Sequence, residues 1–183
     1  MPGPGDWSRP PAGTRGTVAA PLINVPAVVH LRGHASREVR LFLKENSVFR
    51  AGSDLPRDVF ADERDFLPVR DPEWGLILVR RKALILIEVP EERDSDRAAE
   101  LAEEQGHRGE EVAVYLEDGT LLQGRTDPLS PDRFPRVQDL LNARDSFLRL
   151  RGAGRVQLVN KGYIVWVRPL TEQFGGRDPL DDA

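Results

Sequence analysis

The feature that most constrains this chain is a pattern of strands and turns that occurs twice. The segment 112–124, V-A-V-Y-L-E-D-G-T-L-L-Q-G, alternates apolar and polar residues up to Asp118-Gly119, a pair that favours the turn of a β-hairpin. Residues 39–51 show the same alternation at an offset of 73, with Glu45-Asn46 in the place of the turn. Such a repeat has to be recognised before a fold is assigned, because each copy is expected to form the same small unit.

The correspondence continues through the rest of each copy. Residues 58–67 match residues 139–148 at an offset of 81, and residues 76–87 match residues 156–167 at an offset of 80. Loops absorb length changes of this size. Each copy reads as strand, turn, strand, a loop with a short helix (near residues 137–141 in the second copy), then strand, turn and strand.

We therefore predict a mainly β chain made of two tandem small antiparallel β-barrels or rolls, of the Sm-like or SH3-like kind, each with a short helix. A unit of about 60 residues buries only about 60% of its unfolded surface and is marginally stable alone. The two copies are thus expected to pack on each other as a pseudo-dimer. The aromatic residues Trp74, Tyr163 and Trp166 are assigned to packing in the cores or between the copies.

Composition divides the chain into five segments. Residues 1–24 are rich in proline and glycine and predict a flexible arm, residues 25–90 hold the first copy, and residues 112–170 hold the second. Residues 91–111 contain nine acids and three bases and predict an acidic, partly helical linker, while residues 171–183 predict a disordered acidic tail. Flexible ends of this kind suit tethering.

Composition also excludes several kinds of chemistry. The 183 residues include no cysteine, which excludes disulfides, thiolate metal sites and thiol nucleophiles. No apolar run approaches the roughly 20 residues of a membrane span, and no charged segment followed by an apolar one marks a secretory signal. We therefore expect a cytoplasmic protein with no membrane partner and no cofactor.

The second copy resembles an uncharacterised family of bacterial domains of unknown function over most of residues 118–167. The matching stretches are D-G-T-L-L-Q-G (118–124), V-Q-D-L-L-N (137–142), F-L-R-L (147–150) and V-Q-L-V-N-K-G-Y-I-V-W-V (156–167). The first copy is a divergent version of the same pattern. The resemblance implies a bacterial small β-domain, present as two tandem copies, and implies no activity.

One hairpin is also similar to the first motif of Sm-like barrels, in which one glycine follows an apolar strand residue after three positions and a second follows after five more. Leu116, Gly119 and Gly124 have this spacing. The Asp-x-x-x-Asn of the RNA pocket in that family does not follow, because Asp139 and Asn142 lie too far downstream and one residue too close together. The similarity therefore implies an Sm-like topology without its RNA pocket.

The candidate contact residues are basic side chains at or near two equivalent predicted hairpin tips. They are Arg80, Arg81, Lys82, Arg151, Arg155 and Lys161. A basic surface of this kind binds phosphates with an affinity that depends on salt. The same charges also serve to keep strand edges from pairing with other chains.

The sequence carries no Gly-rich phosphate loop, nucleophile elbow or zinc-protease motif. The acids of residues 58–65 have the chemistry of a cation site or of paired carboxylates, but interspersed arginines favour a solvated helix face. We therefore expect a non-enzymatic bacterial protein-interaction or assembly module with a protein partner, and a homo-oligomer stays open. The alternatives are a nucleic-acid-binding Sm-like protein that uses the basic tips, and an enzyme or metal protein that uses the 58–65 acids.

Overall fold

The structure is a computed structural model that describes residues 22–45, 54–61, 64–94, 109–126 and 137–170. Within these residues the protein is mainly β, as the sequence predicts: ten antiparallel strands form one sheet, accompanied by two short helices. No helix of the described part is long and apolar enough to cross a membrane.

The elements follow one another in a regular order along the chain. The strands are β1 (Leu22–Leu31), β2 (Arg37–Lys44), β3 (Phe66–Asp71), β4 (Gly75–Arg80), β5 (Leu84–Pro90), β6 (Glu111–Leu116), β7 (Leu121–Thr126), β8 (Phe147–Gly152), β9 (Arg155–Asn160) and β10 (Ile164–Pro169). The helices are α1 (Pro56–Ala61) and α3 (Val137–Asn142), and the 3₁₀ turns are η1 (Arg81–Ala83), η2 (Glu91–Arg93) and η3 (Lys161–Tyr163).

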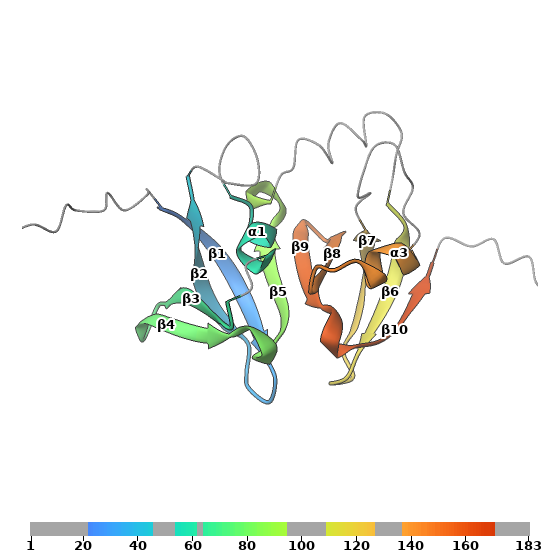
Figure 1. Cartoon of the computed structure of the whole chain (residues 1–183), viewed down its shortest axis with the longest axis horizontal. Helices are drawn as coiled ribbons and strands as arrows, with labels where there is room; N and C mark the ends of the chain where they lie inside the picture. The colour runs from blue at the N-terminus through green and yellow to red at the C-terminus, as the bar shows by residue number, and fades with distance from the viewer. Residues whose placement is uncertain (1–21, 46–53, 62–63, 95–108, 127–136, 171–183) are drawn as a thin grey trace, which may run out of the picture.

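The strand order of the sheet is β10-β6-β7-β8-β9-β5-β1-β2-β3-β4. The first half of the chain, β1–β5, and the second half, β6–β10, therefore share one internal order, in which the fifth strand lies beside the first and the fourth lies at the far edge. Figure 1 shows the halves side by side, with β5 next to β9 in the middle and with β4 and β10 at opposite ends. The sheet is open rather than closed into barrels, and within the described residues β4 and β10 form its two edges.

The hairpin of the first half lies one strand earlier than the offset of 73 predicts. Residues 39–44 belong to β2, the second strand of its half, whereas residues 112–116 belong to β6, the first strand. The counterpart of the β6–β7 turn is thus the β1–β2 turn, where Gly33 takes the positive φ that Gly119 takes in the second half. The offsets of 81 and 80 do pair elements that occupy the same place in each half, namely α1 with α3 and β3, β4 and β5 with β8, β9 and β10.

Each half has an apolar core, and each core receives side chains from the other half. In β2, for example, Val39, Leu41 and Leu43 are buried, as expected for a strand with one face on a core. The core of the first half also contains Phe147, Val156 and Leu158 from β8 and β9. The core of the second half contains Ile85 and Leu86 from β5. The halves are therefore packed together through their cores.

Several predicted segments lie wholly or partly outside the described residues. These are the arm before Leu22, the turn after Glu45, the helical part of the linker within residues 95–108, and the tail 171–183. Strand β1 begins at Leu22, so the first half starts three residues before the predicted boundary at residue 25. The beginning of the predicted linker is also structured, since it contains η2 and the buried Asp94.

Candidate functional site

The two halves are joined by the pairing of β5 with β9. This antiparallel junction contains five residue pairs. Successive residues of a strand point to opposite faces. Ile87 and its partner Leu158 therefore belong to the core of the first half, whereas Leu86 and its partner Val159 belong to the core of the second half. The junction is a continuous part of the sheet with one core on each face.

Polar contacts close the end of this junction that lies near η1 and η3. The Asn160 side chain donates from Nδ2 to the carbonyl oxygen of Leu84 at 2.8 Å. The Tyr163 hydroxyl donates to the carbonyl oxygen of Lys82 at 2.5 Å. Both hydrogen bonds satisfy backbone acceptors of the first half with side chains of the second, which fixes the register of the two strands.

A buried ion pair links the segment that follows β5 and η2 to strand β8 of the second half. Arg149 of β8 donates from Nε to Oδ2 of Asp94 at 2.5 Å and from Nη2 to the Asp94 carbonyl oxygen at 2.9 Å. Burial raises the pKa of the Asp94 carboxyl, and the nearby positive charge of Arg149 opposes this rise. The pair ties the segment that leaves β5 to the second half of the molecule.

Within the described residues, β4 and β10 are the two edges of the sheet, and both carry exposed apolar side chains. On β4, Leu76 and Leu78 are 66% and 65% exposed, whereas Val156 and Leu158, which occupy the same places in β9, are 0% and 1% exposed. A strand edge with unpaired backbone groups and exposed apolar side chains is a ready template for pairing with another strand. The β4 edge therefore exposes apolar residues of the kind that are buried at the equivalent positions of β9.

The β10 edge shows the same contrast. Val165 and Trp166 are exposed, whereas Ile85 and Leu86, their counterparts in β5, are buried in the second core. The Trp166 ring stacks on Tyr115 of the neighbouring strand β6, with 5.1 Å between ring centroids. This stack holds a large apolar side chain at the edge of the sheet, in an orientation fixed by the strand beside it.

The apolar surface near β4 continues into a groove on the outer face of the first half. This groove has a volume of about 680 Å³, and its lining includes Leu22, Phe42, Phe66, Pro68 and Leu76. Contiguous exposed apolar surface of this kind marks interaction sites more often than it occurs by chance on a soluble protein. The groove extends the β4 edge across the outer face of neighbouring strands.

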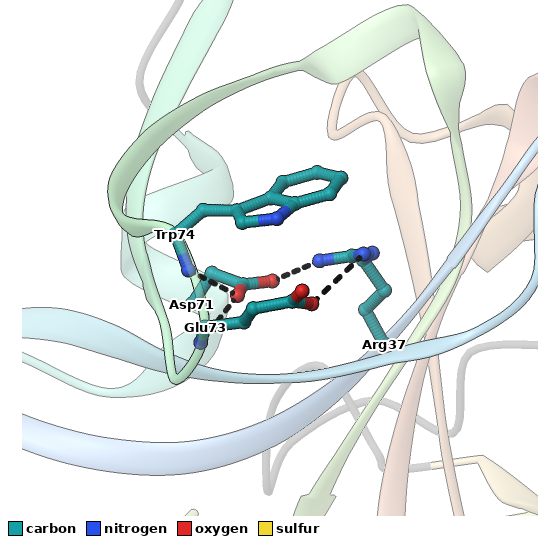
Figure 2. Close-up of polar contacts among 4 residues, drawn as sticks. All are labelled: Arg37, Asp71, Glu73 and Trp74. Atoms are coloured by element: carbon teal, nitrogen blue, oxygen red, sulfur yellow. Dashed lines mark hydrogen bonds and ion pairs between the residues drawn. The ribbon is translucent and has the colours of Figure 1, made fainter.

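The turn between β3 and β4 is held rigid by a polar cluster at its base (Figure 2). The Asp71 carboxylate accepts hydrogen bonds from the backbone N–H groups of Glu73 and Trp74, at 2.8 and 2.9 Å, and pairs with the Arg37 guanidinium. That guanidinium lies 3.7 Å from the centre of the Trp74 ring. The Trp74 N–H, together with those of Glu73 and Arg37, holds the pKa of Asp71 below its usual value. The cluster presents the β4 edge in a defined position.

Two of the predicted basic contact residues bind carbonyl oxygens at the end of the α-helix in the same half of the chain. Arg81 does so at α1 and Lys161 at α3. Arg81 Nη1 donates to the carbonyl oxygen of Phe60, and Lys161 Nζ donates to those of Leu140 and Ala143 at 2.5 and 3.1 Å. Lysine and arginine side chains near a helix C-terminus commonly satisfy its last carbonyls. These two residues occupy equivalent places in the two halves and have the same structural role.

The remaining predicted contact residues are divided between the two ends of the junction. Arg80 is exposed immediately before η1, and Lys82 is exposed within it. Arg155 lies at the opposite end of β9 from Lys161 and forms an ion pair with Glu88 at 3.2 Å. Arg151 lies on β8, towards its turn into β9. The structure therefore places the six basic residues at two separate ends of the junction.

The predicted acidic site also has a structural explanation where it is described. Asp58 is buried, and its carboxylate accepts the backbone N–H of Leu55 at 2.8 Å at the start of α1. Residues 62 and 63 lie outside the described part of the chain. Among the residues that the structure describes, no group of three or more metal-binding side chains is found.

Sequence reasoning missed both the buried pair Asp94–Arg149 and the exposure of the two edges. Tyr163 is buried and contacts the first half, as predicted, but Trp74 and Trp166 are exposed. The available signal was topological: the fourth strand of the first copy and the fifth strand of the second have no further copy to cover them. The exposure of these two strands can be predicted only when the strand order of the sheet is known.

The chain matches no protein-family model, no curated protein and no solved structure. The candidate site is therefore defined by geometry: two open sheet edges that expose apolar side chains whose counterparts within the same molecule are buried.

Proposed function

We propose that this chain is a non-enzymatic, bacterial protein-interaction or assembly module built from two copies of a small Sm-like β unit. The observation that carries the proposal is the contrast between exposed Leu76 and Leu78 on β4 and their buried counterparts on β9. The equal strand order of the two halves and the equivalent helix contacts of Arg81 and Lys161 support a duplicated unit.

A partner strand is the ligand that this surface fits best. Exposed edges are usually protected by charged or inward-bent residues, whereas the central residues of β4 are Leu76, Ile77 and Leu78. Strand addition supplies backbone hydrogen bonds for affinity and apolar contacts for specificity. Asp71 and Asp94, whose pKa values are shifted, serve ion pairs that hold the fold.

Site-specific photocrosslinking tests this proposal. A photoreactive residue at Leu78 or Trp166 of the full chain, expressed in its native host, should give crosslinks to protein. The matched control is Leu121, which is 53% exposed but lies on β7 inside the sheet rather than at an edge. Equal crosslinking from edge and control positions would show that the edges are not binding surfaces.

The alternative proposal, nucleic-acid binding through the basic tips, rests on the exposed Arg80 and Lys82 at η1. It has less support, because Arg81 and Lys161 bind helix carbonyls and Arg155 pairs with Glu88. Titration with short RNA and DNA at two salt concentrations tests it, since binding through phosphates weakens steeply as salt increases. Binding that disappears in an Arg80→Ala/Lys82→Ala double variant would favour this alternative over strand pairing.

A further inference from the structure

We infer that the partner of each free edge is a second copy of this chain, in which β10 of one copy pairs with β4 of the next. The inference rests on the proposed function and names its partner. The template is the junction inside the molecule, where the fifth strand of one half, β5, pairs with the fourth strand of the other, β9. The two free edges are a fifth strand, β10, and a fourth strand, β4. Because a fifth strand pairs with a fourth strand inside the molecule, the free fifth strand β10 of one copy is expected to pair with the free fourth strand β4 of another.

The side chains at the free edges correspond to those that the internal junction buries. Val156 and Leu158 of β9 enter the core of the first half, and Leu76 and Leu78 stand in their places on β4. Pairing of β4 with β10 of another copy would place these two leucines against the second core of that copy. The same pairing would cover the exposed Trp166 with the first half of its neighbour, as Leu86 is covered within the chain.

A further contact supports this arrangement. Phe147 of β8 packs on Phe60 of α1 across the internal junction, with 5.0 Å between ring centroids. The residues at the same places in the other halves are the exposed Phe66 of β3 and the half-buried Leu141 of α3. Between two copies these two apolar side chains would meet in the same way, so the complementarity extends beyond the paired strands to the neighbouring helix.

The offset of 80 converts the internal register into a predicted one between copies. The internal pair Ile87↔Leu158 predicts Val167 opposite Leu78. The pairs between copies are expected to be Trp166↔Val79, Val167↔Leu78, Arg168↔Ile77 and Pro169↔Leu76. All of these side chains except Arg168 are apolar or proline, as a buried ladder requires.

Charge also favours pairing between unlike edges. Glu88 of β5 pairs with Arg155 at the internal junction, and Arg168 stands in the place of Glu88 on β10. The β4 strand follows a turn that carries the exposed Glu73. Pairing of β10 with β4 brings Arg168 towards this acidic turn, whereas a second β10 edge carries no acidic residue to meet it.

An interface between unlike surfaces is head-to-tail, so it generates a ring if the rotation closes and an open filament if it does not. Each added copy repeats the operation that relates the two halves within the chain. The expected assembly is therefore built from whole chains and contains an even number of halves.

Complementation between two edge variants tests the inference. Leu78→Arg blocks the β4 edge and Trp166→Arg blocks the β10 edge, with Val165→Arg as a second β10 variant in case loss of the Tyr115 stack perturbs folding. Wild type is expected to assemble, measured by light scattering and sedimentation. Each variant should weaken self-association by about a hundredfold or more, the scale of a charge in an apolar interface. An equimolar mixture of the two variants should form a one-to-one dimer, because one intact edge of each kind remains.

Several results would overturn the inference. A monomeric wild type at every concentration would do so, as would a Trp166→Arg variant that dimerises alone through its β4 edge. A variant at Leu121 serves as the control and should assemble like wild type. A monomeric wild type whose edge positions still crosslink to a different protein would leave the proposed function intact, whereas loss of all edge crosslinks would overturn both.

Disulfide trapping tests the register, and the absence of native cysteine makes the background clean. Oxidation of the Ile77→Cys/Arg168→Cys variant should link copies to one another. The internal equivalent, Glu88→Cys/Gln157→Cys, should form a bridge within the chain, since these two residues are directly opposite each other in the β5–β9 pair. An Arg168→Cys/Leu121→Cys variant should stay unlinked, and equal linking of this control would contradict the register.

Discussion

Replacement of Leu158 by alanine at the internal junction should cost far more stability than replacement of Leu78 by alanine at the free β4 edge. The two leucines occupy the same place in the fourth strand of their halves, two residues before the end of β9 and of β4. They differ in one respect: Leu158 is covered by the other half, and Leu78 has no such cover. The pair of variants therefore isolates the contribution of the junction.

The expected magnitudes follow from burial. A fully buried leucine that is truncated to alanine costs about 3–5 kcal/mol, through lost transfer free energy and the cavity that remains. Leu158 is fully buried in the first core, so its truncation belongs in this range. Leu78 keeps about a third of its surface covered in the single chain, which scales the cost to about 1 kcal/mol. The difference between the two variants should be about 2 kcal/mol or more.

Urea unfolding followed by circular dichroism at high dilution measures both values, with Leu121→Ala as a third, exposed variant away from the edges. At high protein concentration Leu78→Ala should lose additional apparent stability relative to wild type, because association stabilises the folded state by mass action. A Leu78→Ala variant as unstable as Leu158→Ala at high dilution would refute the assignment of β4 as an open edge.

Four further predictions concern residues that hold the fold. Asp94→Ala should lower the free energy of unfolding by about 3 kcal/mol in a urea titration, because it removes a buried partner of Arg149. In Arg149→Met the pKa of Asp94, already raised by burial, should rise further, so the penalty relative to wild type should grow as the pH increases above 3.8. Asp71 has a lowered pKa, so the stability advantage of wild type over Asp71→Asn should be complete at neutral pH and disappear as the pH falls below 3.8 in acid titrations of thermal unfolding. Gly124→Ala should destabilise by about 1–3 kcal/mol in the same urea assay, because its Cβ would lie 2.8 Å from a backbone oxygen of β8.

The sequence predicts the fold best where the apolar pattern of a segment and the offset between the two copies indicate the same element. The offsets of 81 and 80 relate α1 to α3, and β3, β4 and β5 to β8, β9 and β10, and the structure has these elements at the corresponding positions. The short helix with Val137 and Leu140 buried was also predicted from the spacing of its apolar residues. In these regions the period of the apolar pattern and the turn residues identify the same elements.

The first hairpin was assigned wrongly because alternation does not distinguish one strand from the next. Val39, Leu41 and Leu43 alternate as well as the residues of β6 do, but they form the second strand of their half. The first strand of that half is β1, which contains Pro26, and although proline favours a strand start or an edge strand, β1 lies between β5 and β2. Periodicity reports which face of a strand is buried and carries no information about its place in the sheet.

The candidate site was missed for a related reason. Leu78 and Leu158 are the same residue type at the same place in each copy, so their local sequences predict equal burial. What differs is whether another strand covers them, and this depends on the pairing of β5 with β9, which joins distant parts of the chain. The ion pair of Asp94 with Arg149, 55 residues apart, likewise depends on that pairing.

The internal junction and the proposed junction between copies differ in strength for a physical reason. Covalent linkage makes the pairing of β5 with β9 an intramolecular event, which avoids most of the translational and rotational entropy lost on association. The internal junction also has the buried pair of Asp94 with Arg149 and the hydrogen bond from Asn160. Arg80 and Gly75 replace Asn160 and Arg155 at the free β4 edge, so the ion pair with Glu88 and that hydrogen bond have no direct equivalent there. The internal junction should therefore persist at any dilution, whereas the fraction of chains in contact with another copy should increase with protein concentration. The smallest unit that assembles is then the single chain with its two halves paired.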